Sequence, residues 1–141
     1  MKKIAVVYWS GTGNTGMMAD AVLEGIKGAG AEGTLFTASD FSADMMDDYD
    51  AIAFGCPSMG AEQLEEYEFE PMFTACEAKL SGKKIALFGS YGWGDGEWMR
   101  YWDAQVKADG ADVACDFVIC NEAPDDEAKE ACRALGAALA G

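Results

Sequence analysis

The stretch SGTGNTG, residues 10–16, lies between the apolar run IAVVYW at residues 4–9 and a segment whose apolar residues have helical spacing. A glycine-rich turn between a strand and a helix exposes backbone N–H groups at the positive end of the helix dipole, where phosphates bind. The glycines at 11, 13 and 16 also fit the pattern G-x-G-x-x-G of dinucleotide-binding proteins. The stretch therefore predicts a phosphate-binding turn, and the rest of the chain has to decide which phosphate it binds.

Two nucleotide motifs lack residues that they require. A dinucleotide site needs an acidic residue about 20 positions on, at the end of the second strand, to hold a ribose. That strand ends LFTA, at residues 35–38, without a carboxylate. A P-loop for nucleoside triphosphates needs Gly-Lys followed by Ser or Thr, but no lysine lies between Lys3 and Lys27. Neither motif accounts for the stretch.

The stretch is instead rich in neutral hydrogen-bond donors. Ser10, Thr12 and Thr15 offer hydroxyls, and Asn14 offers an amide. With the N–H groups of the glycines, these donors can satisfy the oxygens of a terminal phosphate monoester without a cation. The alternative is a plain glycine-rich turn in which Thr15 caps the following helix. The alternate spacing of the hydroxyls favours the anion site.

Strand and helix patterns alternate along the whole chain. Apolar runs rich in β-branched or aromatic residues occur at 4–9, 34–37, 51–55, 85–89 and 113–119, and helical spacing occurs at 17–26, 69–80, 98–106 and 127–139. The segment 40–48 is weakly helical at best. This alternation predicts an α/β fold, a three-layer sandwich with a five-stranded parallel sheet and helices on both faces. With 141 residues, we expect one domain spanning 1–141.

In such a sheet, ligands bind beyond the carboxyl ends of the strands, where the strand order reverses. Three loops lie there: SGTGNT after the first strand, CPSMGAEQ after the third and SYGWGDG after the fourth. A tryptophan between glycines, and a methionine before a glycine, are poor choices for loops that only turn a corner. We therefore expect these three loops to form one binding site.

The composition excludes several classes of function. There are 25 acidic and 10 basic residues, a net charge of −15 that repels nucleic acid and anionic membranes and favours basic protein surfaces. The N-terminus lacks a long apolar signal region, so we expect a soluble protein that is not exported. No histidine is present, which excludes Ser-His and Cys-His catalysis and leaves difficult chemistry to a cofactor.

The cysteines indicate a cytoplasmic location. They number five, at positions 56, 76, 115, 120 and 132, and form no C-x-x-C pair. An odd number without metal or disulfide spacing is typical of reduced thiols. Among folds of this class, a receiver domain needs an aspartate at the end of the third strand, where Gly55 and Cys56 stand, and no cysteine has the arginine five residues on that a phosphatase needs.

Three segments together resemble a known family. YWSGTGNT, CPSMGAEQLEEYEFEPM and GKKIALFGSYGWGDGEWMR are similar to the short-chain bacterial flavodoxins, and the match covers essentially the whole chain. The resemblance implies the sheet order 2-1-3-4-5 and non-covalently bound FMN, held at the switch between the first and third strands. It implies a low-potential one-electron carrier that uses the semiquinone/hydroquinone couple and is not an enzyme. A flavodoxin-like NAD(P)H:quinone reductase is the alternative.

The resemblance also implies which residues contact FMN. Trp93 would stack on the isoalloxazine ring and Met59 would cover its inner face. The Gly60 peptide would turn over on reduction, and Glu62 would accept a hydrogen bond from flavin N3-H. The full predicted set is Ser10, Gly11, Thr12, Gly13, Asn14 and Thr15 for the phosphate, with Pro57, Ser58, Met59, Gly60, Ala61, Glu62, Ser90, Tyr91, Gly92, Trp93 and Gly94 for the ring and its ribityl chain.

Two positions depart from the family pattern. Pro57 stands where relatives often have a serine that helps to hold phosphate, and Ser58 follows it. Ala61 stands where relatives commonly have an aspartate, which should change how easily the Gly60 peptide turns.

The predicted partners are basic-faced redox enzymes in transient complexes, with the protein itself a monomer. Near the expected flavin edge the sequence places an acidic rim of exposed carboxylates, which would steer a basic surface into a brief encounter. Its expected members are Glu62, Glu65, Glu66, Asp95 and Glu97.

Overall fold

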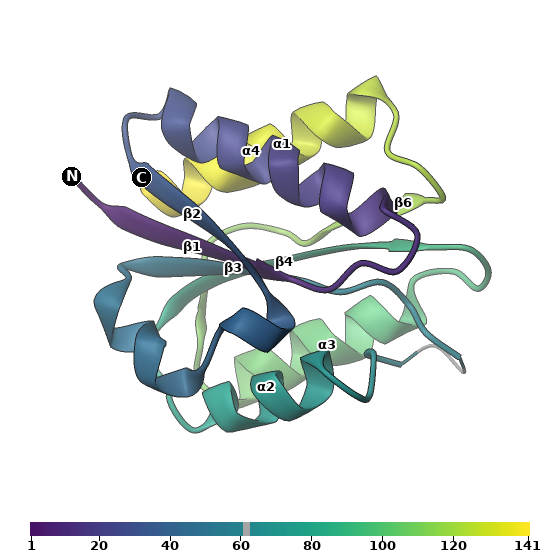
Figure 1. Ribbon diagram of the computed structural model, residues 1–141, viewed down its shortest axis with the longest axis horizontal. Helices are drawn as coiled ribbons and strands as arrows, with labels where there is room; N and C mark the ends of the chain where they lie inside the picture. The colour runs from purple at the N-terminus through teal and green to yellow at the C-terminus, as the bar shows by residue number, and fades with distance from the viewer. Residues whose placement is uncertain (61–62) are drawn as a thin grey trace.

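The protein is a three-layer α/β sandwich in a computed structural model that describes residues 1–60 and 63–141 (Figure 1). The strands are β1 (Lys3–Tyr8), β2 (Glu32–Thr37), β3 (Ala51–Gly55), β4 (Lys84–Tyr91), β5 (Asp112–Val113) and β6 (Val118–Asn121). Their order is β2-β1-β3-β4-β5, with β6 also paired to β4, and the paired strands are parallel. The predicted fold class and strand order are confirmed.

The fifth predicted strand is interrupted, so its bounds were wrong. Ile85 pairs with Val113, and Phe88 pairs with Val118. Between these two pairs the edge segment advances by five residues, from 113 to 118, while β4 advances by three, from 85 to 88. The two extra residues bulge out of the ladder of paired strands. An apolar run does not reveal such a bulge, because the run itself continues through it.

The helices cover both faces of the sheet. Figure 1 shows α1 (Asn14–Gly28) and α4 (Asp126–Ala140) on one face, and α2 (Phe69–Glu77) and α3 (Glu97–Ala108) on the other. These match the four predicted helices to within a few residues at each end. The segment predicted to be weakly helical forms two 3₁₀ helices, Ala38–Asp40 and Ala43–Asp48.

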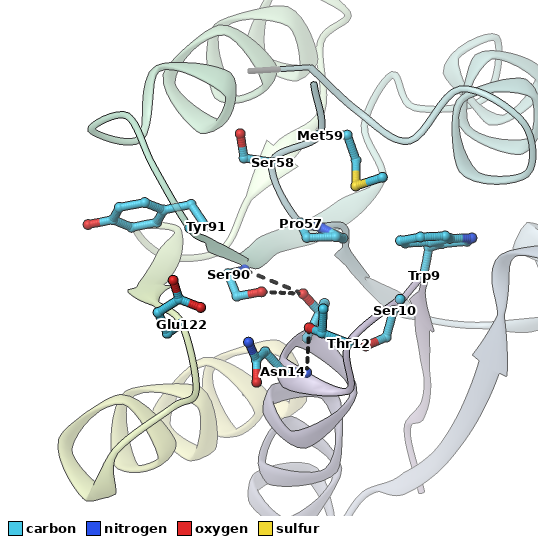
Figure 2. Close-up of a pocket in the computed structure, with 13 residues that line it drawn as sticks. Trp9, Ser10, Thr12, Asn14, Pro57, Ser58, Met59, Ser90, Tyr91 and Glu122 are labelled. Atoms are coloured by element: carbon cyan, nitrogen blue, oxygen red, sulfur yellow. Dashed lines mark hydrogen bonds between the residues drawn. The ribbon is translucent and has the colours of Figure 1, made fainter. Parts of the chain in front are cut away.

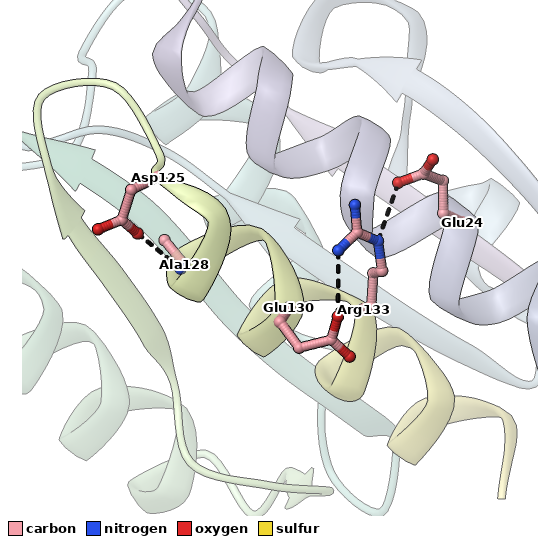
Figure 3. A network of polar contacts seen from close by, with 5 residues as sticks. All are labelled: Glu24, Asp125, Ala128, Glu130 and Arg133. Atoms are coloured by element: carbon pink, nitrogen blue, oxygen red, sulfur yellow. Dashed lines mark hydrogen bonds and ion pairs between the residues drawn. The ribbon is translucent and has the colours of Figure 1, made fainter.

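Close backbone contact joins α1 to α4. A Cβ added to Gly25 would lie 2.0 Å from the carbonyl oxygen of Arg133, and one added to Gly136 would lie 2.2 Å from that of Val22. Across this contact the Arg133 guanidinium bonds Glu24 of α1 at 3.2 Å, and within α4 it bonds Glu130, also at 3.2 Å (Figure 3). At the start of α4 a carboxylate oxygen of Asp125 accepts the Ala128 N–H at 2.8 Å, an N-cap that Figure 3 also shows.

The opposite face is packed by aromatic rings. Phe69 and Phe73 from α2 meet the edge of Trp102 from α3, with centroids 5.4 and 5.5 Å apart. Phe54 from β3 meets Phe73 edge-on at 5.2 Å. This core fixes the strand ends and the starts of α2 and α3, and the loops between them are held at one edge of the sheet.

None of the helices in the described parts of the chain is both long and apolar enough to cross a membrane. All five cysteines have free thiols.

Candidate functional site

A cavity of about 210 Å³ opens at the carboxyl ends of β1, β3 and β4 (Figure 2). Its walls come from the three predicted loops and from the turn after β6: Trp9, Ser10, Gly11, Thr12, Asn14, Thr15, Pro57, Ser58, Met59, Ser90, Tyr91, Gly92 and Glu122. The volume lies below the roughly 300–1,000 Å³ of pockets that bury a whole small ligand. A ligand held here therefore keeps part of its surface outside.

The loop before α1 is shaped by its own side chain Ser10. The Ser10 hydroxyl accepts hydrogen bonds from the backbone N–H groups of Gly13 at 3.1 Å and Gly16 at 3.2 Å. Gly13 lies in the left-handed region, with φ of 97°, which suits glycine. Gly11 leaves room for Trp9, since a Cβ there would lie 2.9 Å from the indole ring. The loop thus closes around one hydroxyl without help from a charge.

Thr15 has a different role from the capping role that the plain-turn alternative gave it. The N-cap of α1 is Gly13, and the hydroxyl that accepts the Gly16 N–H, in the first turn, belongs to Ser10 rather than to Thr15. The Thr15 side chain is buried and its hydroxyl lies 2.9 Å from that of Ser90, at the end of β4. This contact joins the loop after β1 to the loop after β4, because both leave the same edge of the sheet.

The start of α1 is suited to an anion. None of the described residues accepts a hydrogen bond from the backbone N–H groups of Thr12 or Thr15. The first turn of α1 contains no acidic residue. Free N–H groups at a helix N-terminus, together with the hydroxyls of Thr12 and Thr15, form a neutral donor set that fits phosphate oxygens.

The loop after β3 is held to β4 and to itself. The Ser58 N–H donates to the Ser90 carbonyl at 3.0 Å, and Met59 and Gln63 exchange backbone hydrogen bonds at 2.8 and 3.0 Å. Between them Gly60 has φ of 49°, a left-handed conformation, with open space around its Cβ position. The predicted contacts at Ala61 and Glu62 lie outside the described residues.

The loop after β4 presents an exposed indole. Trp93 has 65% of its surface exposed and does not line the cavity. Its neighbour Gly94 is left-handed, with φ of 85°. Of the other predicted residues, Gly13, Gly60 and Gly94 also lie outside the cavity wall. Trp93 is therefore free to pack on a ring that projects from the cavity.

Two residues of the cavity wall are missing from the sequence prediction, Trp9 and Glu122. Trp9 directly precedes the turn predicted to bind phosphate, so its position was a usable signal. Glu122 follows β6 with φ of 59°, the one non-glycine residue with positive φ among the described residues. Its carboxylate lies beside Gly92, 3.5 Å from where a Cβ would stand. Nothing in the local sequence marks that approach.

Glu65 corrects the predicted acidic rim, because it is not an exposed carboxylate. Only 4% of its surface is exposed. Its carboxylate accepts hydrogen bonds from the N–H groups of Tyr67 at 2.9 Å and of Glu68 and Phe69 at 2.8 Å. Burial opposes ionisation, but the three backbone donors outweigh it and lower the pKa of Glu65. Glu66, Asp95 and Glu97 are exposed as predicted, and Asp95 also bonds Arg100 at 2.9 Å.

Comparison with known proteins places the chain. The flavodoxin family model matches residues 6–136. Flavodoxins of Megasphaera elsdenii and Clostridium beijerinckii are each 44% identical, over 97% and 96% of this chain and 98% and 97% of theirs. The solution structure of two-electron reduced M. elsdenii flavodoxin superposes with a TM-score of 0.89 at 45% identity, covering 97% of this chain and 98% of that one. With its sheet order and its three loops at one edge, this chain belongs to the flavodoxin family.

Proposed function

We propose that residues 10–15 hold the phosphate of FMN, that the loops 57–62 and 90–94 hold its ring, and that the chain 1–141 acts as one FMN-binding domain. The observation that carries the phosphate assignment is the pair of free backbone N–H groups, of Thr12 and Thr15, beside neutral hydroxyls at the start of α1. Such donors suit a terminal phosphate, which riboflavin lacks.

As a flavodoxin, the protein is an FMN-binding, low-potential electron carrier and not an enzyme. Family membership thus decides between the two functions that the sequence left open, in favour of the carrier over the quinone reductase. FMN, when bound, supplies the redox chemistry by taking up and returning single electrons. The side chains of this protein bind it, orient it and set the charge around it.

The ring would lie where the cavity opens between Tyr91, Gly92 and Met59. Trp93, exposed beside this opening, would stack on the outer face of the ring, and Met59 would cover the inner face. The Gly60 carbonyl and Glu62 would accept hydrogen bonds from N5-H and N3-H of the flavin. The N–H groups of the loop after β4 would donate to its carbonyl oxygens. Pro57 has no backbone N–H to offer a ligand. The backbone N–H of the next residue, Ser58, is already bonded to the Ser90 carbonyl of β4.

Negative charge is expected to keep the potential low. The net charge is −15, and Glu122 adds a carboxylate at the cavity wall. One unit charge about 10 Å away at an effective dielectric of about 20 opposes the addition of an electron by about 1.7 kcal/mol. Solvent screens exposed carboxylates strongly, so each contributes less than this, but all act in the same direction.

Flavodoxins pass electrons in transient complexes with redox partners. We infer that this chain meets basic-faced enzymes as a monomer in the cytoplasm. Glu122 is an exposed carboxylate at the cavity wall, and with the exposed Glu66 and Glu97 it would attract a basic surface. The five free thiols suit a reducing compartment.

The test is a comparison of FMN with riboflavin. We expect the purified protein to be yellow, and the apoprotein to bind FMN far more tightly than riboflavin in titrations of flavin fluorescence. Equal dissociation constants for the two flavins would contradict the phosphate site at residues 10–15. Failure to bind either flavin would contradict the proposed function itself.

A further inference from the structure

We propose that Glu65 and Cys56 are positioning residues that hold the two ends of the loop 57–64 together and so set the affinity for the flavin ring. The inference rests on the proposed function, because that loop is the one assigned to the ring. It concerns neither the phosphate contacts nor the acidic surface.

Glu65 fixes the far end of the loop to α2. Its carboxylate accepts three backbone N–H groups at 2.8–2.9 Å and its backbone carbonyl accepts the N–H of Glu70 at 2.8 Å. Hydrogen bonds to an ionised, buried acceptor are stronger than those between neutral groups. Phe69, whose N–H Glu65 accepts, is packed against Trp102 in the aromatic core. Glu65 is therefore attached to the core through Phe69.

Cys56 links the near end of the loop to the far end. Its thiol lies 3.5 Å from the Pro57 carbonyl, to which it donates, and 3.4 Å from the N–H of Glu65, which it accepts. Burial raises the pKa of Cys56 to about 12, so the thiol keeps the proton that it donates. Trp98 Nε1 bonds the Cys56 carbonyl at 3.2 Å and fixes this residue in turn.

The consequence is a loop closed at two levels. Cys56 and Glu65 close its base, and the paired hydrogen bonds of Met59 and Gln63 close it nearer the tip. Between these two closures, Ser58 and Met59 keep their places in the cavity wall. If the base opens, the ring loses a pre-formed wall, and binding must pay the cost of ordering it.

The test is Glu65→Gln, with Glu70→Gln as its matched control. In Glu65→Gln, an N–H₂ group replaces one carboxylate oxygen and faces a backbone N–H that has lost its acceptor. Glu70 is an exposed carboxylate in the first turn of α2, so Glu70→Gln makes the same chemical change without removing a buried acceptor. We expect Glu65→Gln to raise the dissociation constants of both FMN and riboflavin about five- to tenfold, the size expected when one hydrogen bond of ordinary strength is lost and the other two are kept. Glu70→Gln should leave both within about twofold.

Measuring both FMN and riboflavin distinguishes an effect of Glu65 on the site of the ring from an effect on the phosphate site. An equal factor for FMN and riboflavin supports the inference, because they share the ring. An effect on FMN alone, or no effect beyond that of Glu70→Gln, overturns it. If the wild-type apoprotein binds neither flavin, the proposed function fails, and the inference falls with it.

A second pair of variants keeps the test valid if circular dichroism shows that Glu65→Gln does not fold. Cys76 is another buried thiol, on α2 itself, and it bonds the Met72 sulfur rather than the loop. Cys56→Ala should weaken both flavins about threefold more than Cys76→Ala, although each removes one buried sulfur. Equal affinities in these two variants would overturn the inference.

Discussion

The loop after β1 and the loop after β3 both line the cavity, but different contacts hold them in place. The first folds around the Ser10 hydroxyl and is tied across the sheet through Thr15 and Ser90. The second is held at its base by Glu65 and Cys56 and leaves Gly60 in a left-handed conformation at its tip. A phosphate does not change during electron transfer, and a rigid cradle suits it. A flavin ring would change its charge or its protonation when it gains an electron, and a loop that is fixed at its base and carries a glycine next to the ring would suit such a change.

The largest expected effect tests the cradle. Replacing both Thr12 and Thr15 by Ala should weaken FMN by about 2 to 4 kcal/mol, since one hydrogen bond to a charged group is worth about 1.5 to 3 kcal/mol and the Thr15 hydroxyl, which also bonds Ser90, adds less than a second one. That loss is roughly one to three powers of ten in the dissociation constant. Riboflavin should bind nearly as before. Fluorescence titrations with the two flavins measure the ratio, and an unchanged ratio would remove these hydroxyls from the phosphate site.

The next effect tests the stacking surface. Trp93→Ala should weaken both flavins by about 1 to 3 kcal/mol, by analogy with bases stacked on aromatic side chains. The fluorescence of bound flavin should rise, because the indole no longer quenches it. Tyr101→Ala removes another exposed aromatic side chain, on α3, and serves as the control. Quenched fluorescence and unchanged affinity in Trp93→Ala would mean that another residue stacks on the ring.

Gly60→Thr tests the adaptable tip. A β-branched residue at the left-handed φ of 49° should cost on the order of 1 to 2 kcal/mol. We expect a lower midpoint potential for the first electron, by roughly 40 to 90 mV, if this left-handed conformation is required more strictly after the electron arrives than before it. Ala61→Gly should shift this potential in the opposite direction if residue 61 takes the positive φ.

Gly82→Thr is the matched control for this prediction. Gly82 also has positive φ, 77°, with open space around its Cβ position, but it lies at the opposite edge of the sheet from the cavity. It should lower stability in urea by a similar amount without changing the potential. If potentiometric titration finds the same first-electron potential in Gly60→Thr, Ala61→Gly and the wild type, the peptide does not turn in this loop.

Acid should weaken the contacts that Glu65 makes at the base of the loop 57–64, the ring-side loop. The three backbone donors lower the pKa of Glu65 below that of an ordinary glutamate, about 4.3. The resulting stability is fully present above that pH and is lost as the pH falls through the lowered pKa. Glu65→Gln should therefore cost about 1 kcal/mol near pH 7 and flatten the acid limb of a urea-stability profile. A variant with the wild-type acid limb would show that other carboxyls dominate it.

The smallest effect concerns charge at the cavity wall. Glu122→Gln removes an exposed carboxylate there, which at about 10 Å in a water-like dielectric is worth about 0.4 kcal/mol, or roughly 20 mV in the potential of FMN. The potential should rise. Glu32→Gln, at the start of the edge strand β2, should leave it unchanged. Added salt should shrink the difference between the two variants.

Local patterns sufficed for the architecture and for the loops of the site. The four helices and the strand order follow from hydrophobic periodicity and from the resemblance, and both are confirmed. The break between β5 and β6 was missed because an apolar run has the same appearance whether or not two of its residues leave the ladder. The chemistry of the turn at residues 10–16 was readable because its hydroxyls and glycines are neighbours in the chain.

By itself the sequence determined the family, the α/β architecture and the neutral, glycine-rich turn, since each depends on residues close together in the chain. Only the tertiary structure decided that Glu65 is buried beneath the ring-side loop, that Glu122 lies beside Gly92, and that Thr15 meets Ser90 from 75 positions away. The physical reason is that a parallel sheet brings the carboxyl ends of distant strands to one edge. Whether an acidic residue there is solvated or buried depends on the backbone N–H groups that surround it, and composition does not record them.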